Sequence, residues 1–216
     1  MTVIMRYTLR LLTLQQYQRA SSLICAAEAI RRERDDLGDE EISICLWVGK
    51  ASTPLTLADT RTALQKLREG GSLEENNPVQ LRECPWCGTP LSHKNYWVAD
   101  RNPRLVIACR NEACEFEKGL PCYLVDEDVY NKRPTLMIAT VDKFASLPWR
   151  DTVGSMFNVD DVEPPPELII QDELHLISGP LGTMVGLYET AIHSLCSDGG
   201  IGPKIIASTA TIRRAE

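Results

Sequence analysis

The sequence lacks any apolar run that approaches the roughly 18 residues needed to cross a bilayer. Its first residues also lack the apolar stretch and the small-residue cleavage site of a signal peptide. We therefore expect a soluble, cytoplasmic protein with no membrane partner. The 216 residues, 44% of them hydrophobic, suffice for one sizeable core with a small satellite domain beside it.

Positive charge is also scarce, because 23 Lys and Arg stand against 30 Asp and Glu, which gives a net charge of −7. This balance argues against a surface that binds polyanions everywhere. Residues 1–34 differ, since they carry six arginines against two glutamates. That local excess leaves room for phosphate binding at particular edges, although solvated helix faces account for Arg31, Arg32 and Arg34.

The sequence has no complete phosphate-binding loop of the form G-x-x-x-x-G-K-[ST]. The nearest match is VGKAST at 48–53, which follows an apolar run. Ile44 stands where the first glycine should be, and Ala51 stands where a hydroxyl residue should follow Lys50. We interpret Lys50 as an exposed loop residue, and we expect any nucleotide site in this chain to be incomplete.

Short apolar runs alternate with helical patterns along the chain, which predicts an α/β fold with a parallel sheet and helices on both faces. The first helix is expected to begin at Thr8, or at Thr13, which has capping-box spacing with Gln16. The predicted strands are 2–7, 42–48, 135–140, 168–171 and 204–209, and the other predicted helices cover 57–68, a short stretch near 141–147, and 180–195.

Helical spacing predicts one apolar face on each of the two long helices. In the first helix this face comprises Leu14, Tyr17, Leu23, Ile24, Ala27 and Ile30. In the last helix Met184, Leu187 and Ile192 are expected in the core.

Eight cysteines would suit a disulfide scaffold only in a short secreted chain, which this is not. CPWC at 84–87 and CRNEAC at 109–114 form two pairs separated by 21 residues. Four thiolates complete a tetrahedral shell with no open position, so the spacing predicts a structural zinc site. A redox CxxC is the alternative, but that motif should open a helix after a strand. The predicted ligands are Cys84, Cys87, Cys109 and Cys114.

The cysteine segment 83–121 shows little apolar periodicity and follows a polar linker at 70–83. We interpret it as an inserted module that divides an α/β domain into 1–82 and 122–216. Cys122 is an alternative to Cys114 as a ligand, although LPCYLV looks like the start of a strand. His93 is a further alternative ligand, and Cys25, Cys45 and Cys196 are interpreted as small buried residues.

Two carboxylates and an imidazole, Asp172, Glu173 and His175, follow the predicted strand at 168–171. The carboxyl end of a parallel strand faces the crevice where such sheets bind ligands. Adjacent carboxylates there can divide the work: Asp172 would hold magnesium, and Glu173 would deprotonate the water that attacks a phosphate. DELH alone is a weak signal, because exposed acidic pairs with a nearby histidine are common.

Four segments, MRYTLRLLTLQQ, IATVDKFASL, IIQDELH and IIASTAT, stand in this order, each at the end of a predicted strand. This series resembles motifs Ia, Ib, II (the DExH box) and III in the first motor domain of superfamily 2 helicases. The resemblance implies a RecA-like fold of the P-loop NTPase type, without its first strand and P-loop, and Mg-ATP as cofactor. The match to motif III, at Ser208, Thr209, Ala210 and Thr211, has one residue too many, and we prefer the register that starts at Thr209.

The resemblance assigns Asp172 to Mg-ATP, Glu173 to water activation, and His175 with motif III to coupling between nucleotide and nucleic acid. It also implies a strand-binding surface that mostly contacts phosphates and therefore has no sequence preference. Without the resemblance, Thr8 is a helix cap and Asp142 forms a surface ion pair with Lys143. The implied nucleic-acid residues are Thr8, Arg10, Thr140, Asp142 and Lys143.

More narrowly, LWVGKASTP, the four-cysteine insertion, ATVDKFA and DELHLISGPLGTMVGLYE are similar to the helicase subunit of the DISARM anti-phage defence system. This implies ATP-driven movement on single-stranded or duplex DNA and a partner subunit. Motif I would lie upstream and the second motor domain downstream, so the chain is expected to be an internal fragment that is inactive alone. The alternative is a non-catalytic, zinc-dependent module that binds nucleic acid or protein.

Overall fold

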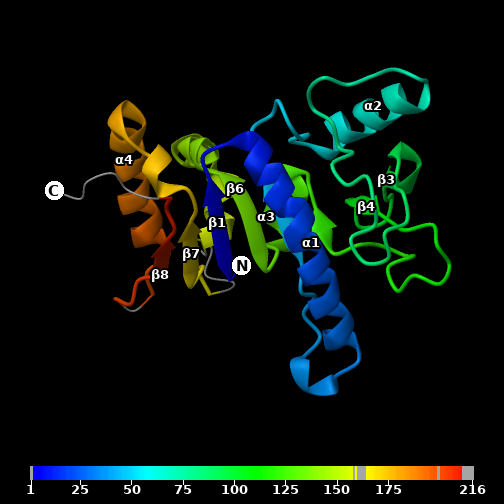
Figure 1. Cartoon of the computed structure of the whole chain (residues 1–216), viewed down its shortest axis with the longest axis horizontal. Helices are drawn as coiled ribbons and strands as arrows, with labels where there is room; N and C mark the ends of the chain where they lie inside the picture. The colour runs from blue at the N-terminus through cyan, green and yellow to red at the C-terminus, as the bar shows by residue number, and fades with distance from the viewer. Residues whose placement is uncertain (1, 158, 160–163, 199, 211–216) are drawn as a thin grey trace.

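The computed structural model describes residues 2–157, 159, 164–198 and 200–210. Its centre is a six-stranded sheet with the order β5-β2-β6-β1-β7-β8, in which all neighbouring strands are parallel (Figure 1). The predicted α/β fold is confirmed, and all five predicted strands are present. The strands are β1 Val3–Tyr7, β2 Ile44–Trp47, β5 Cys122–Tyr123, β6 Leu136–Thr140, β7 Leu168–Gln171 and β8 Lys204–Ala207.

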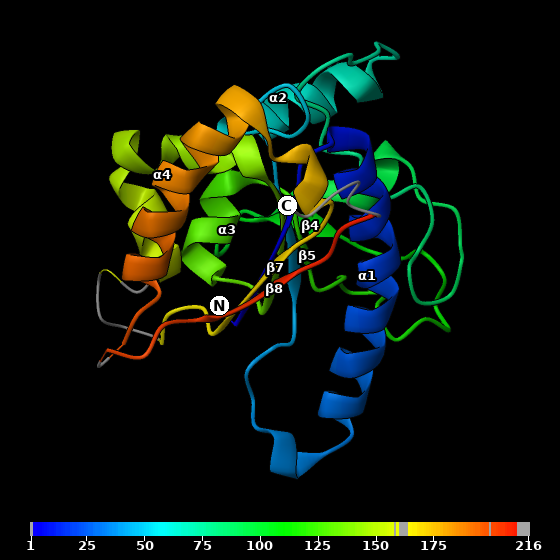
Figure 2. The same cartoon turned by 60° about the vertical axis from the view of Figure 1, so that its left-hand side comes forward.

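Helices cover both faces of the sheet, as Figure 2 shows, because side chains alternate between the faces along each strand. Tyr7 and Leu46 pack under α1 (Arg10–Arg32), whereas Ile4 and Trp47 pack under the helices of the opposite face. That opposite face is covered by α3 (Asp126–Lys132), η3 (Val141–Trp149), η4 (Asp151–Phe157) and α4 (Gly179–Leu195). Of the helices within the described residues, none is long and apolar enough to span a membrane.

Helix α1 begins at Arg10 with Leu9 as its N-cap, so neither predicted start, Thr8 or Thr13, is correct. The Thr13 hydroxyl instead donates to the Leu9 carbonyl oxygen at 2.9 Å within the first turn. The predicted apolar face is also partly wrong, because Leu23 is 68% exposed and Ile30 is 54% exposed. The buried face includes polar and small residues, namely Ser21, Cys25 and Glu28.

The carboxylate of Glu28 is buried because it has enough partners. It accepts hydrogen bonds from Arg31, from Arg32 and from the backbone N–H of Ile42. These bonds lower the pKa of Glu28 although its burial acts in the opposite direction. A prediction that places only apolar residues in the core therefore misses the buried face of this helix.

Helix α4 packs through fewer residues than the sequence predicts. Ile192 is buried as expected, but Met184 is 48% exposed and Leu187 is 65% exposed. The expectation that both lie in the core is wrong, because α4 contacts the core mainly through Val185, Ile192 and the helix end. All four residues of the neighbouring edge strand β8 are exposed as well.

The cysteine segment folds as a small insertion beside the sheet (Figure 1), and its two strands, β3 (Tyr96–Val98) and β4 (Leu105–Ile107), are antiparallel. The insertion contacts α3, because the backbone N–H of Leu105 donates to Asp128 Oδ2 at 2.8 Å. It contacts α1 as well, because the Arg32 guanidinium lies 4.8 Å from the Phe116 ring centroid. The boundaries 1–82, 83–121 and 122–216 stay predictions.

Helix α2 (Leu57–Arg68) has the predicted bounds and follows the loop after β2. Its N-cap is Thr56, whose hydroxyl accepts the backbone N–H of Asp59 at 3.1 Å. The helix lies beside the insertion at the carboxyl edge of the sheet, close to the start of α1 (Figure 1).

Candidate active site and metal centre

The DELH segment begins directly where β7 ends, at the carboxyl edge of the sheet. Gln171 is in register with Arg6 of β1 on one side and with Ala207 of β8 on the other. The ladder continues past the strand ends, because Asp172 N donates to Arg6 O at 3.0 Å and Ser208 N donates to Gln171 O at 2.9 Å. Parallel pairing therefore brings Asp172 next to Ser208, although 36 residues separate them.

Asp172 is held by two hydrogen bonds to one carboxylate oxygen. The Ser208 hydroxyl donates to Asp172 Oδ1, and the backbone N–H of Glu173 donates to the same atom at 2.9 Å. Among the described residues Oδ2 has no hydrogen-bond donor, so it is available for a ligand. Of the predicted motif III residues, Ser208 contacts the DELH segment, whereas Thr209 donates to the carbonyl oxygen of Ala210 and Thr211 lies outside the described residues.

Glu173 has a left-handed backbone, with φ of +53°, which costs free energy in a residue that is not glycine. The turn is fixed by its neighbour, since Leu174 N donates to Ser208 O at 2.9 Å. It places Glu173 Oε2 at 3.3 Å from His175 Nδ1, with both side chains about one third exposed. The structure thus brings the two carboxylates, the imidazole and Ser208 to one edge, where His175 can orient Glu173.

A buried polar layer lies under this edge. Arg6 is 2% exposed, and its guanidinium forms an ion pair at 2.6 Å with Glu189 of α4. Gln171 Nε2 donates to Asp172 O at 2.8 Å and to Arg6 O at 3.3 Å. Burial raises the pKa of Tyr7 to about 12, and the negative charge of Asp172 adds to this effect. The edge that carries Asp172 is therefore supported from β1 and from α4.

Several buried polar atoms at this edge have no hydrogen-bond partner among the described residues. Thr8 Oγ1 and Thr140 Oγ1 lie at the ends of the adjacent strands β1 and β6, and Gln171 Oε1 lies at the end of β7. Buried polar atoms in proteins are normally paired with protein groups, ligands or water. Each of these atoms is fully buried, so that an ordered water or a small movement of the edge would have to supply its missing partner.

The five predicted nucleic-acid residues fall at the ends of β1 and β6. Arg10 is exposed, and its Nη2 donates to the Ala51 carbonyl oxygen at 2.8 Å. Thr8 is half-buried, Thr140 is buried and Asp142 is exposed. Lys143 differs, because it is 7% exposed and its Nζ lies 2.6 Å from Asp126 Oδ2. The alternative of a surface ion pair between Asp142 and Lys143 is wrong, since the partner is Asp126 of α3.

We expect Lys143→Met to lower the free energy of unfolding by about 3 kcal/mol, because it leaves the Asp126 carboxylate buried with Arg150 and Tyr130 as its remaining partners among the described residues. Burial raises the pKa of Asp126 and lowers that of Lys143, while the attraction between them opposes both shifts. Urea denaturation measures the loss, and Asp142→Asn is the control.

The salt dependence of single-stranded DNA binding separates this structural role from a phosphate contact. A lost phosphate contact should reduce the slope of log K against log salt concentration by about 0.7. If Lys143→Met lowered the free energy of unfolding but did not change the salt slope, Lys143 would not contact a DNA phosphate. Unchanged stability would contradict the ion-pair role.

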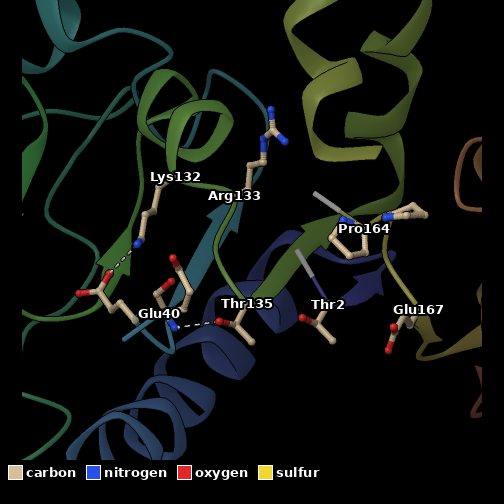
Figure 3. Close-up of a pocket in the computed structure, with 10 residues that line it drawn as sticks. Thr2, Glu40, Lys132, Arg133, Thr135, Pro164 and Glu167 are labelled. Carbon is tan, nitrogen blue, oxygen red and sulfur yellow. Dashed lines mark hydrogen bonds and ion pairs between the residues drawn. The ribbon is translucent and has the colours of Figure 1, made fainter. Parts of the chain in front are cut away.

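Lys50 is exposed in a loop, as predicted. A hollow of about 380 Å³ lies at the opposite, amino-terminal edge of the sheet, and Figure 3 shows Thr2, Thr135 and Glu167 around it. It contains none of the predicted site residues. The candidate active site is therefore at the carboxyl edge.

Four thiols converge in the insertion, although their two pairs are far apart in sequence. The sulfur atoms of Cys84, Cys87, Cys109 and Cys114 all lie within 4.8 Å of one another. Cys87 Sγ is 3.5 Å from Cys109 Sγ, and Cys84 Sγ is 3.9 Å from Cys114 Sγ. A zinc ion with Zn–S bonds of about 2.3 Å holds four thiolates about 3.8 Å apart. The four cysteines therefore fit a tetrahedral metal ion.

The loop after the first cysteine pair supports this arrangement. Gly88 adopts φ of +73°, which a residue with a side chain rarely does, and its N–H donates to Cys84 O at 2.9 Å. Burial opposes ionisation of Cys87, but hydrogen bonds from Thr89 and the neighbouring thiols lower its pKa to about 6. Burial raises the pKa of Cys84 to about 11, so that a bound metal ion would displace its proton.

The alternative ligands lie outside this group. Cys122 is buried in β5, and its hydrogen bond together with burial raises the pKa of Cys25 far above the usual range. His93 opens the short helix η2 (His93–Asn95) and is not one of the clustered groups. The interpretation of Cys122 as a buried strand residue is confirmed, and Cys25, Cys45 and Cys196 are buried as expected.

Comparison with known proteins identifies a relative of this chain. The chain is similar to a segment of a DISARM protein. It is 41% identical to the DISARM protein DrmA of Bacillus paralicheniformis over 256 aligned positions, which include all of this chain and 23% of DrmA. The chain thus spans about a quarter of that relative. A crystal structure of the DUF1998 helicase MrfA matches 98% of this chain and 24% of its own, with a TM-score of 0.35 and 14% identity. No protein-family model matches the chain.

Sequence reasoning missed three residues that support the active-site edge, namely Arg6, Gln171 and Glu189. Arg6 gave a usable signal, because it is the one charged residue in an otherwise apolar strand run. A buried strand that contains an arginine requires a partner, and here the partner is Glu189. Glu189 gave no separate signal, since an acidic residue on a helix is ordinary.

Proposed function

We propose that the chain is a segment of an ATP-dependent nucleic-acid motor, a helicase or translocase in an anti-phage defence system of the cytoplasm. The contact between the Ser208 hydroxyl and Asp172 carries the proposal, because it joins the ends of β7 and β8 where a nucleotide would bind. The 41% identity to the DISARM protein DrmA supports the defence setting and a partner subunit.

Mg-ATP would supply a phosphoryl group whose charge the metal ion neutralises. Asp172 fits the metal, because carboxylate oxygens are ligands that magnesium prefers and Oδ2 is left free by the two bonds to Oδ1. Glu173 would accept the proton of the attacking water, and His175 would hold the Glu173 carboxylate in place. Through its hydrogen bond, Ser208 would couple changes at Asp172 to strand β8.

The described residues contain no glycine-rich phosphate loop, so other parts of a longer protein would have to hold the phosphates. The edge of β8 suits a strand that leads into such a loop. It is next to Asp172, it ends the sheet, and it exposes Ile205 and Ile206. An unpaired apolar edge of this kind favours addition of a strand.

Nucleic acid would bind along the ends of β1 and β6 without sequence preference. Arg10 offers a guanidinium for a phosphate, and the unpartnered hydroxyls of Thr8 and Thr140 lie beside it on adjacent strands. The insertion would bind structural zinc at its four cysteines. A zinc-dependent binding module without turnover is the second candidate, and the cysteine cluster and the lack of a phosphate loop in the described residues favour it.

We expect Ser208→Ala, in the full-length protein, to reduce DNA-stimulated ATP hydrolysis about tenfold to a hundredfold, because a hydrogen bond to a charged carboxylate is lost. The measurement is steady-state phosphate release. Ser197→Ala is the matched control, since within the described residues the Ser197 hydroxyl donates to the His193 carbonyl oxygen of α4 and does not contact Asp172. Equal turnover in all three proteins would reject the contact as the basis of the proposal.

A further inference from the structure

The insertion has a groove that the predicted motor motifs do not use. It has a volume of about 350 Å³ and lies between α2 and β3. Trp97 is 39% exposed in this groove, although large aromatic side chains are usually buried more completely. Its lining residues are Arg61, Leu64, Gln65, Arg68, Trp97 and Val98.

The indole of Trp97 faces away from the core of the insertion because side chains alternate along β3. Tyr96, its neighbour in the strand, is fully buried, and its hydroxyl donates to Leu81 O at 2.8 Å. Trp97 pairs across the hairpin with Val106, which fixes its position in the strand. The groove therefore presents a flat aromatic surface on a rigid hairpin.

Two guanidinium groups accompany this surface, and none of the described residues that line the groove carries a carboxylate, although Gln65 donates to Glu69 Oε1 at 2.9 Å. Arg68 Nη2 donates to the Tyr96 carbonyl oxygen at 3.1 Å, which fixes the guanidinium next to the start of β3. Arg61 is 52% exposed, and its ion-pair partner among the described residues, Asp100, lies 3.8 Å away and is 99% exposed. An exposed pair of this kind is weak, so that Arg61 can bind another anion.

A loop links the proposed nucleic-acid surface to the helix that lines the groove. Arg10 at the start of α1 donates to Ala51 O in the loop after β2, and this loop leads directly into α2. Figure 1 shows the start of α1 and helix α2 at the same edge of the sheet. A strand that follows the ends of β1 and β6 can therefore continue along α2.

We propose that this groove binds an unpaired nucleotide of a single-stranded nucleic acid, with its base stacked on Trp97 and its phosphates near Arg61 and Arg68. The combination of aromatic faces and guanidinium groups is how proteins bind single strands without sequence preference. The inference deepens the proposed function, on which it rests for the path of the strand.

The test measures binding of a fluorescein-labelled oligothymidylate to the 216-residue chain, loaded with zinc, by fluorescence anisotropy. We expect Trp97→Ala to weaken binding about tenfold, since one stacked base contributes that much, and Trp97→Phe to retain most of it. Trp149→Ala is the control, because Trp149 is 84% exposed and lies outside the groove. Circular dichroism and zinc content confirm that each variant is folded.

Three further ligands separate stacking from other effects. With an abasic strand, Trp97→Ala should bind like the wild type, because no base is present to stack. Duplex DNA should also show no difference, and an oligouridylate distinguishes a preference for RNA from one for DNA. Arg61→Glu should weaken the binding of all these ligands.

The inference would be overturned by equal affinity of wild type and Trp97→Ala for oligothymidylate, or by an equal loss on the abasic strand. A wild-type chain that binds none of the ligands would overturn it as well. If Ser208→Ala reduced ATP hydrolysis but Trp97→Ala left DNA binding unchanged, the proposed motor function would stand and the groove would not be a nucleotide site. If Trp97→Ala weakened DNA binding but Ser208→Ala left ATP hydrolysis unchanged, the groove would stand as a nucleotide site and the contact between Ser208 and Asp172 would not support a motor.

Discussion

Glu173→Gln is expected to reduce ATP hydrolysis by the full-length protein at least about a hundredfold, because general-base catalysis contributes about 10² to 10⁴ in rate. The substitution keeps the size of the side chain and removes its basicity. Its amide oxygen can still accept a hydrogen bond from His175, so the turn after β7 should remain in place. ATP binding, measured with a fluorescent ATP analogue, should stay within about twofold of the wild type, since the proposed metal ligand is Asp172.

The matched control for this experiment is Glu167→Gln. Glu167 lies immediately before β7, at the amino-terminal end of the strand that carries Glu173 at its other end (Figure 3). Its substitution makes the same chemical change on the opposite edge of the sheet, where hydrolysis should be unaffected. Unchanged turnover in Glu173→Gln would show that Glu173 is not the base. A loss of ATP binding together with turnover would make Glu173 a structural residue of the site.

The position of this centre could be predicted because it depends on local patterns. Short apolar runs identified the strands that form the sheet, and parallel strands must end at a common edge. Asp172 and Ser208 each follow such a run directly, so that their proximity followed once the sheet was parallel. Which hydroxyl reaches Asp172 depends on the register between β7 and β8 at the level of single residues. Sequence matching favoured Thr209, whereas the ladder places Ser208 there.

Long-range polar pairs could not be predicted. Lys143 meets Asp126 of another helix, and Arg6 of β1 meets Glu189 of α4. Neither partner differs, in sequence, from the exposed charged residues that surround it. The same limit explains Glu28, which is buried because Arg31, Arg32 and a backbone N–H satisfy it.

The exposed apolar residues have a different cause. Leu187 of α4 and Ile206 of β8 follow the patterns of core residues, but nothing within the described part of the chain covers them. Apolar periodicity indicates that a face is to be buried without indicating what buries it. Both residues lie on the flank of the sheet that the proposed function assigns to other parts of a longer protein.

Removal of the metal should have the second largest effect. We expect Cys84→Ser combined with Cys87→Ser to abolish zinc binding and to unfold the insertion while the parallel sheet stays folded. Structural zinc sites contribute about 10 to 16 kcal/mol of binding free energy, far more than two strands of three residues can supply. Atomic absorption should fall from one zinc ion per chain to none, and limited proteolysis should cleave within 83–121.

Cys84, Cys109 and Cys114 pack in the same cluster as α1 and β2, but the sheet should survive because most of its core lies outside the insertion. Tyr17 and Ile24 of α1 pack on Ile44 and Leu46 of β2, and the opposite face is closed by a separate cluster around Trp47 and Phe144. Far-ultraviolet circular dichroism should therefore retain most of its helical signal. Loss of the whole cooperative transition would instead mean that the insertion is required for folding of the sheet.

Cys122→Ala is the matched control for the metal experiment. It removes a buried thiol only a few residues beyond the cluster, in a strand that pairs with β2. The variant should lose some stability through its small cavity but should keep one zinc ion per chain. If Cys122→Ala lost the metal, or if the double variant retained it, the assignment of the four ligands would be wrong. If the double variant lost zinc but still bound DNA and hydrolysed ATP in the full-length protein, the metal would serve only to fold the insertion.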